Sequence, residues 1–317
     1  IIVADCLPAD VARMLEHFGS SNGAPPIIAN SAIQTAECLL TFLRSGVADI
    51  VPLPLADFSI LDMAVERQME KVRLYRENRQ YRMELEAVNK ELRAGLEELQ
   101  ADQRAGRHVQ MKMLPERDID INGLHFDYCL KPSLYLSGDF FEYFRLDEHK
   151  VAFYFADVAG HGASSAFVTV LLKNLCNRLK RNLRRGSSSD LLHPDRFMAR
   201  VNMELLETAI GKHLTLFMGI IDAQERQLSY SLGAHFPMPI LTQGGQSAFL
   251  EGKGPPLGLF ETARYPLYQT SIQKGFAITI CSDGLLEVIN ARSIADKEAA
   301  LLETVREHGH TIRALEK

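Results

Sequence analysis

The sequence predicts a chain of three parts: an α/β module, a long helical linker, and an α+β β-sandwich flanked by helices. Three observations support this division. Short apolar stretches alternate with amphipathic ones over residues 1–61, charged residues without any proline dominate residues 62–112, and β-branched and aromatic stretches recur over residues 113–317. Alternating strand and helix patterns indicate a parallel sheet, whereas many strands with a helical pair indicate an α+β arrangement.

In the first part, strands are expected at residues 1–4, 27–29 and 48–51, which are short and mostly apolar. Helices are expected between them at residues 11–18 and 34–44, where apolar residues recur at helical spacing. The opening Ile1-Ile2-Val3-Ala4 has no initiator methionine and is typical of the middle of a buried strand. We therefore expect the natural amino terminus to lie upstream of Ile1.

The second part predicts one long helix with a narrow apolar seam. Five apolar residues recur three or four positions apart along it: Leu85, Val88, Leu92, Leu96 and Leu99. This spacing is typical of a short coiled coil, so it favours a homodimer formed through the linker. A lone solvated helix is the alternative, because Gly95 and Asp102 interrupt the seam.

In the third part, five stretches rich in β-branched and aromatic residues predict strands, at residues 151–156, 214–221, 227–232, 238–241 and 276–281. Two amphipathic stretches, residues 164–183 and 194–207, predict helices, with a Gly-Ser-rich loop at 186–189 between them.

Composition argues against several classes of protein. A formal charge of -5 gives no reason to expect nucleic-acid binding by the whole chain. No apolar run approaches the roughly 18 residues that a membrane helix needs. Five cysteines lie singly, without a CxxC pair, which indicates reduced thiols: Cys6, Cys38, Cys129, Cys176 and Cys281. A cytoplasmic protein is expected.

Three aspartates are expected where apolar strands meet glycine-bearing turns. Asp139 lies in Ser137-Gly138-Asp139, Asp157 follows the strand at 151–156, and Asp283 follows the strand at 276–281. Each alone is explained by ordinary turn chemistry. Three in one region, with glycines that allow close approach, indicate a hard-oxygen site for Mg²⁺ or Mn²⁺.

Six short strings follow one another along the chain: Val109-Gln110-Met111-Lys112-Met113-Leu114-Pro115, Gly138-Asp139-Phe140, Asp157-Val158-Ala159-Gly160-His161-Gly162, Gly233-Ala234-His235-Phe236-Pro237, Pro256-Leu257-Gly258-Leu259 and Ser282-Asp283-Gly284. In this order they resemble the strings of the bacterial SpoIIE/RsbU-like branch of the protein phosphatase 2C superfamily. The resemblance covers about residues 109–290.

This resemblance implies a β-sandwich flanked by helices that binds two Mn²⁺ or Mg²⁺ ions at one end. It implies that Asp157 bridges both ions and that the carbonyl of Val158 ligates one. Asp139 and Asp283 would complete the protein ligands, so the three aspartates are also the candidate catalytic residues. The implied reaction is hydrolysis of phosphoserine or phosphothreonine by a metal-bound water, without a covalent phosphoenzyme.

The chain departs from the family pattern at two places. Eukaryotic relatives have a general-acid histidine two positions after the bridging aspartate, where this chain has Ala159. His161 lies further on and is interpreted as a turn residue. The family also usually ends with an aspartate pair near its last strand, and no such pair occurs before Lys317. Either the last strand is absent from this sequence or the metal site is weakened.

The first part resembles the second half of a response-regulator receiver domain, which has a flavodoxin-like fold. The resemblance rests on residues 1–5 followed by Pro8, on residues 26–31 and on residues 43–49. It implies that Asp5 is the phosphoacceptor and Ser31 the hydroxyl that senses the phosphoryl group. The alternatives are that Asp5 is an ordinary turn residue and that Ser31 caps the helix that follows it. Receivers carry a Lys-Pro pair after the strand that corresponds to residues 48–51, whereas this chain has Leu53-Pro54 at that place.

Receiver, helical linker and phosphatase in this order resemble RssB-like response regulators, and two functions follow from that resemblance. The first is a response regulator with phosphatase output that acts on a phosphorylated anti-sigma-factor antagonist or a similar regulator. The second is an adaptor that binds a stress sigma factor and delivers it for proteolysis, using the phosphatase fold only as a surface.

Overall fold

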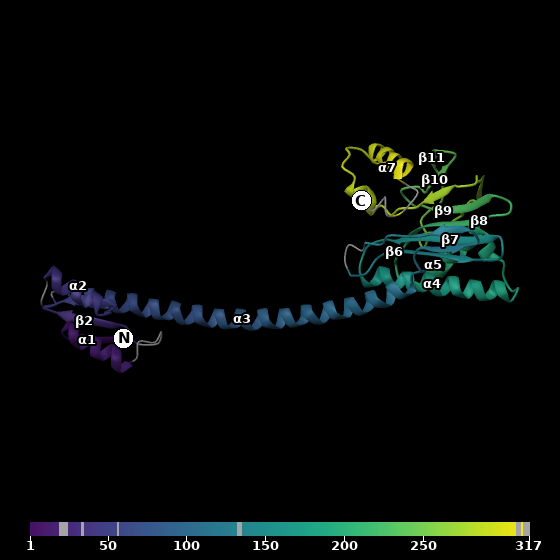
Figure 1. Cartoon of the computed structure of the whole chain (residues 1–317). Coiled ribbons are helices and arrows are strands. Elements are labelled where there is room, and N and C mark those ends of the chain that lie inside the picture. Colours follow the sequence, from purple (N-terminus) through teal and green to yellow (C-terminus); the bar gives the residue numbers. More distant parts are fainter. Residues whose placement is uncertain (19–24, 33–34, 56, 132–134, 309–311, 313–317) are drawn as a thin grey trace. The chain divides into compact units, whose positions relative to one another are not determined.

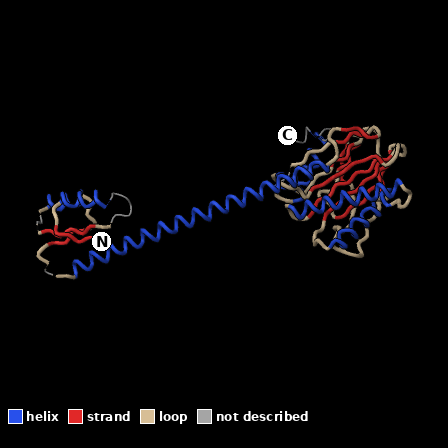
Figure 2. The backbone as a smooth tube through the Cα atoms, turned by 90° about the horizontal axis from the view of Figure 1, so that it is seen from below, coloured by secondary structure: helices blue, strands red, loops and turns tan. Residues whose placement is uncertain are grey.

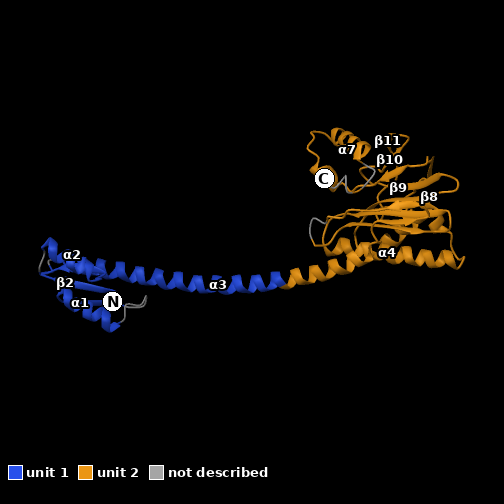
Figure 3. Cartoon of the chain, viewed as in Figure 1, with its two compact units in different colours: residues 1–97 blue, residues 98–317 orange. Residues whose placement is uncertain are grey.

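The computed structural model describes residues 1–18, 25–32, 35–55, 57–131, 135–308 and 312, and its helices and strands are drawn in Figures 1 and 2. The chain forms two compact units, residues 1–97 and 98–317 (Figure 3). The division falls inside the long helix α3 (Ser59–Met113). Gln34, the first residue of the helix expected at 34–44, lies outside the described residues.

The first unit contains a parallel sheet, as the alternating pattern predicted. Its three strands, in the order β1-β2-β3, are β1 (Ile2–Asp5), β2 (Ile27–Ser31) and β3 (Asp49–Pro52). Helices α1 (Pro8–Phe18) and α2 (Ala36–Arg44) connect them. Val11 and Phe42 from these helices pack with Ile27 and Ala29 in one apolar cluster. Ala64, near the start of α3, packs in a second cluster with Ile28 and Val51.

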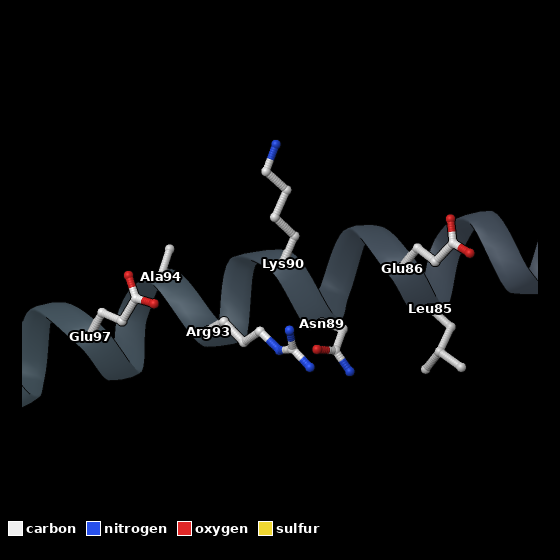
Figure 4. A pocket seen from close by; sticks show the side chains of 7 residues that line it. All are labelled: Leu85, Glu86, Asn89, Lys90, Arg93, Ala94 and Glu97. Carbon is white, nitrogen blue, oxygen red and sulfur yellow. The ribbon is translucent and has the colours of Figure 1, made fainter.

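Helix α3 runs unbroken for 55 residues and extends the expected helix at both ends. The five seam residues are all exposed, from 48% at Leu96 to 67% at Leu85. Figure 4 shows side chains around the middle of this helix, where Leu85 and Lys90 project in opposite directions. Those side chains line a shallow hollow formed by α3 alone. Among the described residues, no helix combines the length and apolar character needed to cross a membrane.

The second unit is a sandwich of two antiparallel sheets. The larger has the order β12-β9-β8-β7-β6, with β6 (Asp139–Arg145), β7 (Lys150–Val158), β8 (Leu214–Asp222), β9 (Gln227–Gly233) and β12 (Tyr268–Ser271). The smaller has the order β11-β10-β13, with β10 (Ile240–Gln243), β11 (Gln246–Phe249) and β13 (Ala277–Thr279). A hairpin of β4 (Ile119–Ile121) and β5 (Leu124–Phe126) precedes them. Aromatic and aliphatic side chains from both sheets form one core.

Helices cover the outer faces of this sandwich. Helices α4 (Ala163–Arg184) and α5 (Pro194–Thr208), joined through the short helix η1 (Asp190–Leu192), pack on the larger sheet. Helix α7 (Ile294–His308), which follows α6 (Gly284–Val288), packs on β10 and β11. Alternate residues of β7 therefore face opposite layers, because side chains alternate along a strand. Tyr154 faces the helices, and Phe153 faces the smaller sheet.

One expectation about Asp139 was wrong in detail. This residue was expected in a turn after a strand, but it is the first residue of β6, a strand that the sequence pattern did not predict. Asp157 was likewise expected just after its strand and instead is its second-last residue. Strand β6 was missed because Glu142 interrupts its apolar run, and a charged residue is rarely buried in a sheet unless it is paired.

The buried carboxylate of Glu142 fastens α4 to β6. It accepts hydrogen bonds from the Tyr154 hydroxyl at 2.9 Å, Lys173 Nζ at 2.8 Å and Lys180 Nζ at 2.5 Å. Burial acts to raise the pKa of Glu142, but the two ammonium groups outweigh it and hold the pKa below its usual value. The charge is thus satisfied, and α4 is fixed on the sheet directly after the loop that follows β7.

Candidate metal centre

Asp139 and Asp157 lie directly opposite each other on neighbouring strands. They are paired in the antiparallel register of β6 and β7. Phe141 and Phe155, two residues further from this end of each strand, stack in parallel planes with their ring centroids 6.4 Å apart. Because alternate residues share a face, both carboxylates point to the side of the smaller sheet. Their β-carbons are about 5 Å apart, as for any residues paired across two strands.

Asp283 approaches the pair from the other sheet. It follows β13 and is the residue before α6, where its side chain is exposed and makes no capping hydrogen bond. Burial, then the charge of Asp283, raise the pKa of Asp139 to about 6, against a hydrogen bond from the Ser282 hydroxyl that lowers it. Burial, then the charges of Asp139 and Asp283, raise the pKa of Asp157 to about 7. The three carboxylates therefore repel one another across a shared space.

The glycine before Asp139 brings a backbone carbonyl into the same region. A β-carbon at Gly138 would lie 2.7 Å from the carbonyl oxygen of Val158 and 3.4 Å from that of Gly160. The amide of Val158 donates to the Gly138 carbonyl at 3.2 Å. Only glycine allows this approach, so the two segments that carry Asp139 and Asp157 are in backbone contact.

The end of α3 fixes the segment before Asp139. The buried side chain of Gln110 donates to the Ser137 carbonyl at 2.7 Å and to Thr169 Oγ1 of α4 at 3.1 Å. Its Oε1 accepts the Ser137 amide at 3.1 Å, and Ser137 Oγ in turn accepts the Asp139 amide at 3.0 Å. Asp139 is thus positioned by hydrogen bonds from a helix and a loop distant in sequence.

The loop after Asp157 is held by the segment that leads into β8. The amide of Ala159 donates to the carbonyl of His213 at 2.9 Å, and Lys212 Nζ donates to the carbonyl of Ala159 at 3.1 Å. Gly160 has a φ of +84°, which favours glycine. Ala159 occupies the position implied for a general acid, and His161 is exposed in the turn.

The buried His235 packs against Phe155, on the same strand as Asp157. Its ring lies 5.3 Å from that of Phe155, centroid to centroid, and burial lowers its pKa to about 4, so it is neutral at physiological pH. Neither ring nitrogen has a hydrogen-bond partner among the described residues.

The donor set fits a hard divalent cation in type. It consists of carboxylate oxygens and one neighbouring backbone carbonyl, which Mg²⁺ and Mn²⁺ prefer, and contains no thiolate. Within the described ranges, however, no three His, Cys, Asp or Glu side chains gather closely enough to hold one ion. Asp139 and Asp157 are paired across two strands, and Asp283 interacts electrostatically with both.

Asp5 and Ser31, the two candidate residues of the first unit, lie at the carboxyl ends of neighbouring strands of its sheet. Asp5 is exposed at the end of β1, and Ser31 is buried at the end of the adjacent parallel strand β2. Asp5 pairs in register with Asn30, and the amide of Leu53 donates to the Ser31 carbonyl at 2.9 Å. The half-buried apolar side chain of Leu53 therefore follows β3 beside the end of β2.

Three side chains that lie beside the candidate site were not predicted from the sequence. Ser282 and Gln110 lie within the family-like strings, so their position was a usable signal. Lys212 lies in no string and has no periodic pattern around it, and only the structure shows its contact with Ala159.

The contact of Gly138 with Val158 predicts the effect of a single methyl group. In Gly138→Ala, the new β-carbon must displace the Val158 carbonyl, so Mn²⁺ affinity should fall by about tenfold or more, the usual cost of disturbing the surroundings of metal ligands. Isothermal titration with Mn²⁺ measures this. Gly95→Ala is the matched control, since no atom lies within 4 Å of its added β-carbon. Unchanged Mn²⁺ affinity in a folded Gly138→Ala protein would contradict the placement of the carbonyl.

The raised pKa values predict the pH response of the protein in a chelator. An unfolded aspartate ionises near 3.8, whereas the pKa values of Asp139 and Asp157 in the folded chain are about 6 and about 7. Between pH 3.8 and about 7, the folded state therefore binds more protons than the unfolded state. As the pH rises through this window, the two carboxyl groups lower the free energy of unfolding. Asp139→Asn removes one such group and should raise that free energy by about 3 kcal/mol above pH 7, because each pH unit between the two pKa values of Asp139 is worth about 1.4 kcal/mol.

Urea unfolding in EDTA across this pH range measures the difference between the two proteins. The gain in Asp139→Asn should vanish near pH 4, where the wild-type carboxyl is protonated in the folded state. A difference that is equal at both ends of the range would exclude charge repulsion as its cause.

Most of the second unit is similar to one known protein family. The model of the family described as Stage II sporulation protein E (SpoIIE) matches residues 147–316. The chain is similar to phosphoserine phosphatase RsbP of Bacillus subtilis, with 25% identity over 186 residues that cover 57% of this chain and 44% of RsbP. It is also similar to phosphoserine phosphatase RsbU of Bacillus subtilis, with 23% identity over 182 residues that cover 57% of this chain and 52% of RsbU. The chain therefore spans about half the length of these curated relatives.

A solved structure supports the fold. The SiaA-PP2C domain of Pseudomonas aeruginosa matches 68% of this chain and 84% of its own with a TM-score of 0.55 at 18% identity, which shows a likeness of fold alone. The expected phosphatase 2C-like sandwich is thereby confirmed as a fold. Since the family model matches more than half of the 317 residues, the chain belongs to the SpoIIE family.

Proposed function

We propose that the second unit is a metal-dependent protein-serine/threonine phosphatase. The observation that carries this proposal is the pairing of Asp139 with Asp157 across β6 and β7, with Asp283 in electrostatic range of both. The names of RsbP and RsbU as phosphoserine phosphatases support the same reaction class. The carbonyl of Val158, the residue after Asp157, would add a fourth oxygen donor.

Each residue has a distinct part in the proposed site. Asp157 would bridge two ions, the Val158 carbonyl would ligate one, and Asp139 and Asp283 would complete the protein ligands. When bound, Mn²⁺ or Mg²⁺ would lower the pKa of a coordinated water and offset the charge of the phosphoryl oxygens. Gln110 holds the backbone before Asp139 through two hydrogen bonds with Ser137.

The proposed substrate is a phosphorylated regulator of the anti-sigma-factor-antagonist type, and the first unit is proposed as a receiver-like input module. Asp5 and Ser31 lie at the carboxyl ends of adjacent parallel strands, where open α/β sheets bind ligands. Leu53 weakens the case for Asp5 phosphorylation, because a lysine cation there would stabilise a phosphoryl group.

An adaptor that binds a stress sigma factor remains the second candidate. It is favoured by the absence of a closed group of three ligand side chains among the residues that the structure describes. The two functions differ in what the site must do, because an adaptor binds its partner equally well when the carboxylates are replaced.

Activity separates these candidates. Full-length protein should release phosphate from a phosphoserine peptide only with Mn²⁺ or Mg²⁺, and Asp157→Asn should lower the rate by at least about a hundredfold, because the bridging carboxylate is lost. The control is Glu225→Gln, an exposed acid in the β8–β9 turn. No turnover at saturating metal, together with sigma-factor binding that survives in Asp157→Asn, would favour the adaptor.

We also propose that the linker pairs with a second copy of itself. Five exposed apolar side chains along α3 would each lose contact with water in a coiled coil, at roughly 25 cal/mol per Å² of buried apolar surface. Charged side chains such as Lys90 occupy the other side of the helix.

Light scattering tests this pairing at micromolar concentration. The wild-type chain should have twice its 35.5 kDa mass, and Leu92→Glu should have the mass of one chain, because it places a charge in the seam. Lys90→Ala, on the opposite side, should remain paired. A wild-type protein with the mass of one chain excludes the homodimer.

A further inference from the structure

The ammonium group of Lys212 lies against the loop that follows Asp157. Its Nζ donates to the carbonyl of Ala159 at 3.1 Å, and a β-carbon added to Gly160 would be only 2.8 Å from it. Ala159 comes directly after Val158, whose carbonyl is a proposed ligand. The ammonium of Lys212 therefore contacts the backbone carbonyl that comes directly after the proposed ligand carbonyl.

The loop that Lys212 contacts also adjoins the segment that carries Asp139. Gly138 approaches the carbonyls of both Val158 and Gly160, so the segment that carries Asp139 and the loop that contacts Lys212 adjoin. Backbone contacts thus join the segments of Asp139 and Asp157, and Lys212 contacts the second of these segments.

The backbone at Lys212 is fixed by its neighbours. The next residue, His213, accepts the Ala159 amide, and Leu214 exchanges both backbone hydrogen bonds with Leu257, at 3.0 and 2.9 Å. A β-carbon at Gly258 would lie 3.0 Å from the Lys212 carbonyl, which shows how closely this loop packs. The cation is therefore presented from a rigid base.

Lys212, like Lys297, is a half-buried lysine of this unit that donates to a backbone carbonyl and has no acidic partner at ion-pair distance among the described residues. Of the two, Lys212 is the one beside the loop that follows Asp157. Lys173 and Lys180 share Glu142, and Lys150 lies 3.7 Å from Asp222. Within the described part of the chain, no carboxylate lies at ion-pair distance from Lys212. An ammonium has three donors, and the Ala159 carbonyl uses one of them. Partial burial of a charge is costly without a counter-ion, so the remaining donors suit an anion from outside the chain.

We propose that Lys212 binds a terminal phosphoryl oxygen of the phosphoserine or phosphothreonine substrate. This inference rests on the proposed phosphatase function and adds the residue that recognises the phosphoryl group. A phosphomonoester carries nearly two negative charges near neutral pH, and lysine binds such groups as a point charge. The same contact should retain inorganic phosphate, the product, which has the same terminal oxygens.

A purely structural role would give a different result. If Lys212 only braces the loop through Ala159, its loss disturbs the Val158 carbonyl and weakens Mn²⁺ binding. If it binds the phosphoryl group, its loss weakens substrate and phosphate binding and leaves Mn²⁺ binding intact.

The test compares Lys212→Met, Lys212→Arg and Lys274→Met with wild type, the last being an exposed lysine remote from these contacts. With a phosphoserine peptide and saturating Mn²⁺, Lys212→Met should raise both KM and the inhibition constant of inorganic phosphate by about tenfold, since a charge-assisted hydrogen bond is lost. Lys212→Arg should recover most of both. Half-saturation by Mn²⁺ and the circular dichroism spectrum should match wild type.

Unchanged phosphate inhibition in Lys212→Met overturns the proposal, as does a loss confined to Mn²⁺ affinity. Failure of the phosphatase function itself is recognised separately, as absence of turnover in wild type. Direct calorimetric titration with inorganic phosphate in Mg²⁺ tests the Lys212 contact without turnover. Wild type should bind at least about tenfold more tightly than Lys212→Met, and equal affinities overturn the contact.

Discussion

Repulsion between Asp139 and Asp157 is the constraint on which the second unit depends. Two like charges opposite each other on adjacent strands destabilise a sheet, and partial burial increases the cost. The surrounding structure holds them there nevertheless. Long aromatic strands pack beneath them, Glu142 fastens α4 to β6, and Gln110 fixes the backbone before Asp139. The stability of the sandwich is thus used to hold a locally unfavourable arrangement, which is typical of functional sites.

The position of the pair at the junction of two layers follows from strand periodicity. Alternate residues of β7 face the helices and the smaller sheet, so Asp157 shares the face of Phe153 and Phe155. Asp283 enters from the second sheet after β13. A site built from both sheets needs both to be packed, which explains why its members are so widely separated in sequence.

Much of this architecture could be predicted from local patterns. The parallel sheet, the long helix, and the strands β7, β8 and β9 have clear periodicity, and the structure confirms them. Strand β6 was missed because Glu142 reads as a surface residue until its two lysine partners are known. The approach of Lys212 to Ala159 could not be predicted, since it joins residues 53 positions apart through packing alone. The roles of Asp5 and Ser31 and the pairing of α3 remain predictions.

The hydrogen bonds of Gln110 have a consequence for folding. They join positions 27 and 59 residues apart, and the antiparallel pairing of Asp139 with Asp157 spans a further turn of the chain. Contacts between distant positions form late, because loop closure must precede them. A fragment that emerges from synthesis before Thr169 therefore lacks one of the contacts through which Gln110 fixes the backbone before Asp139.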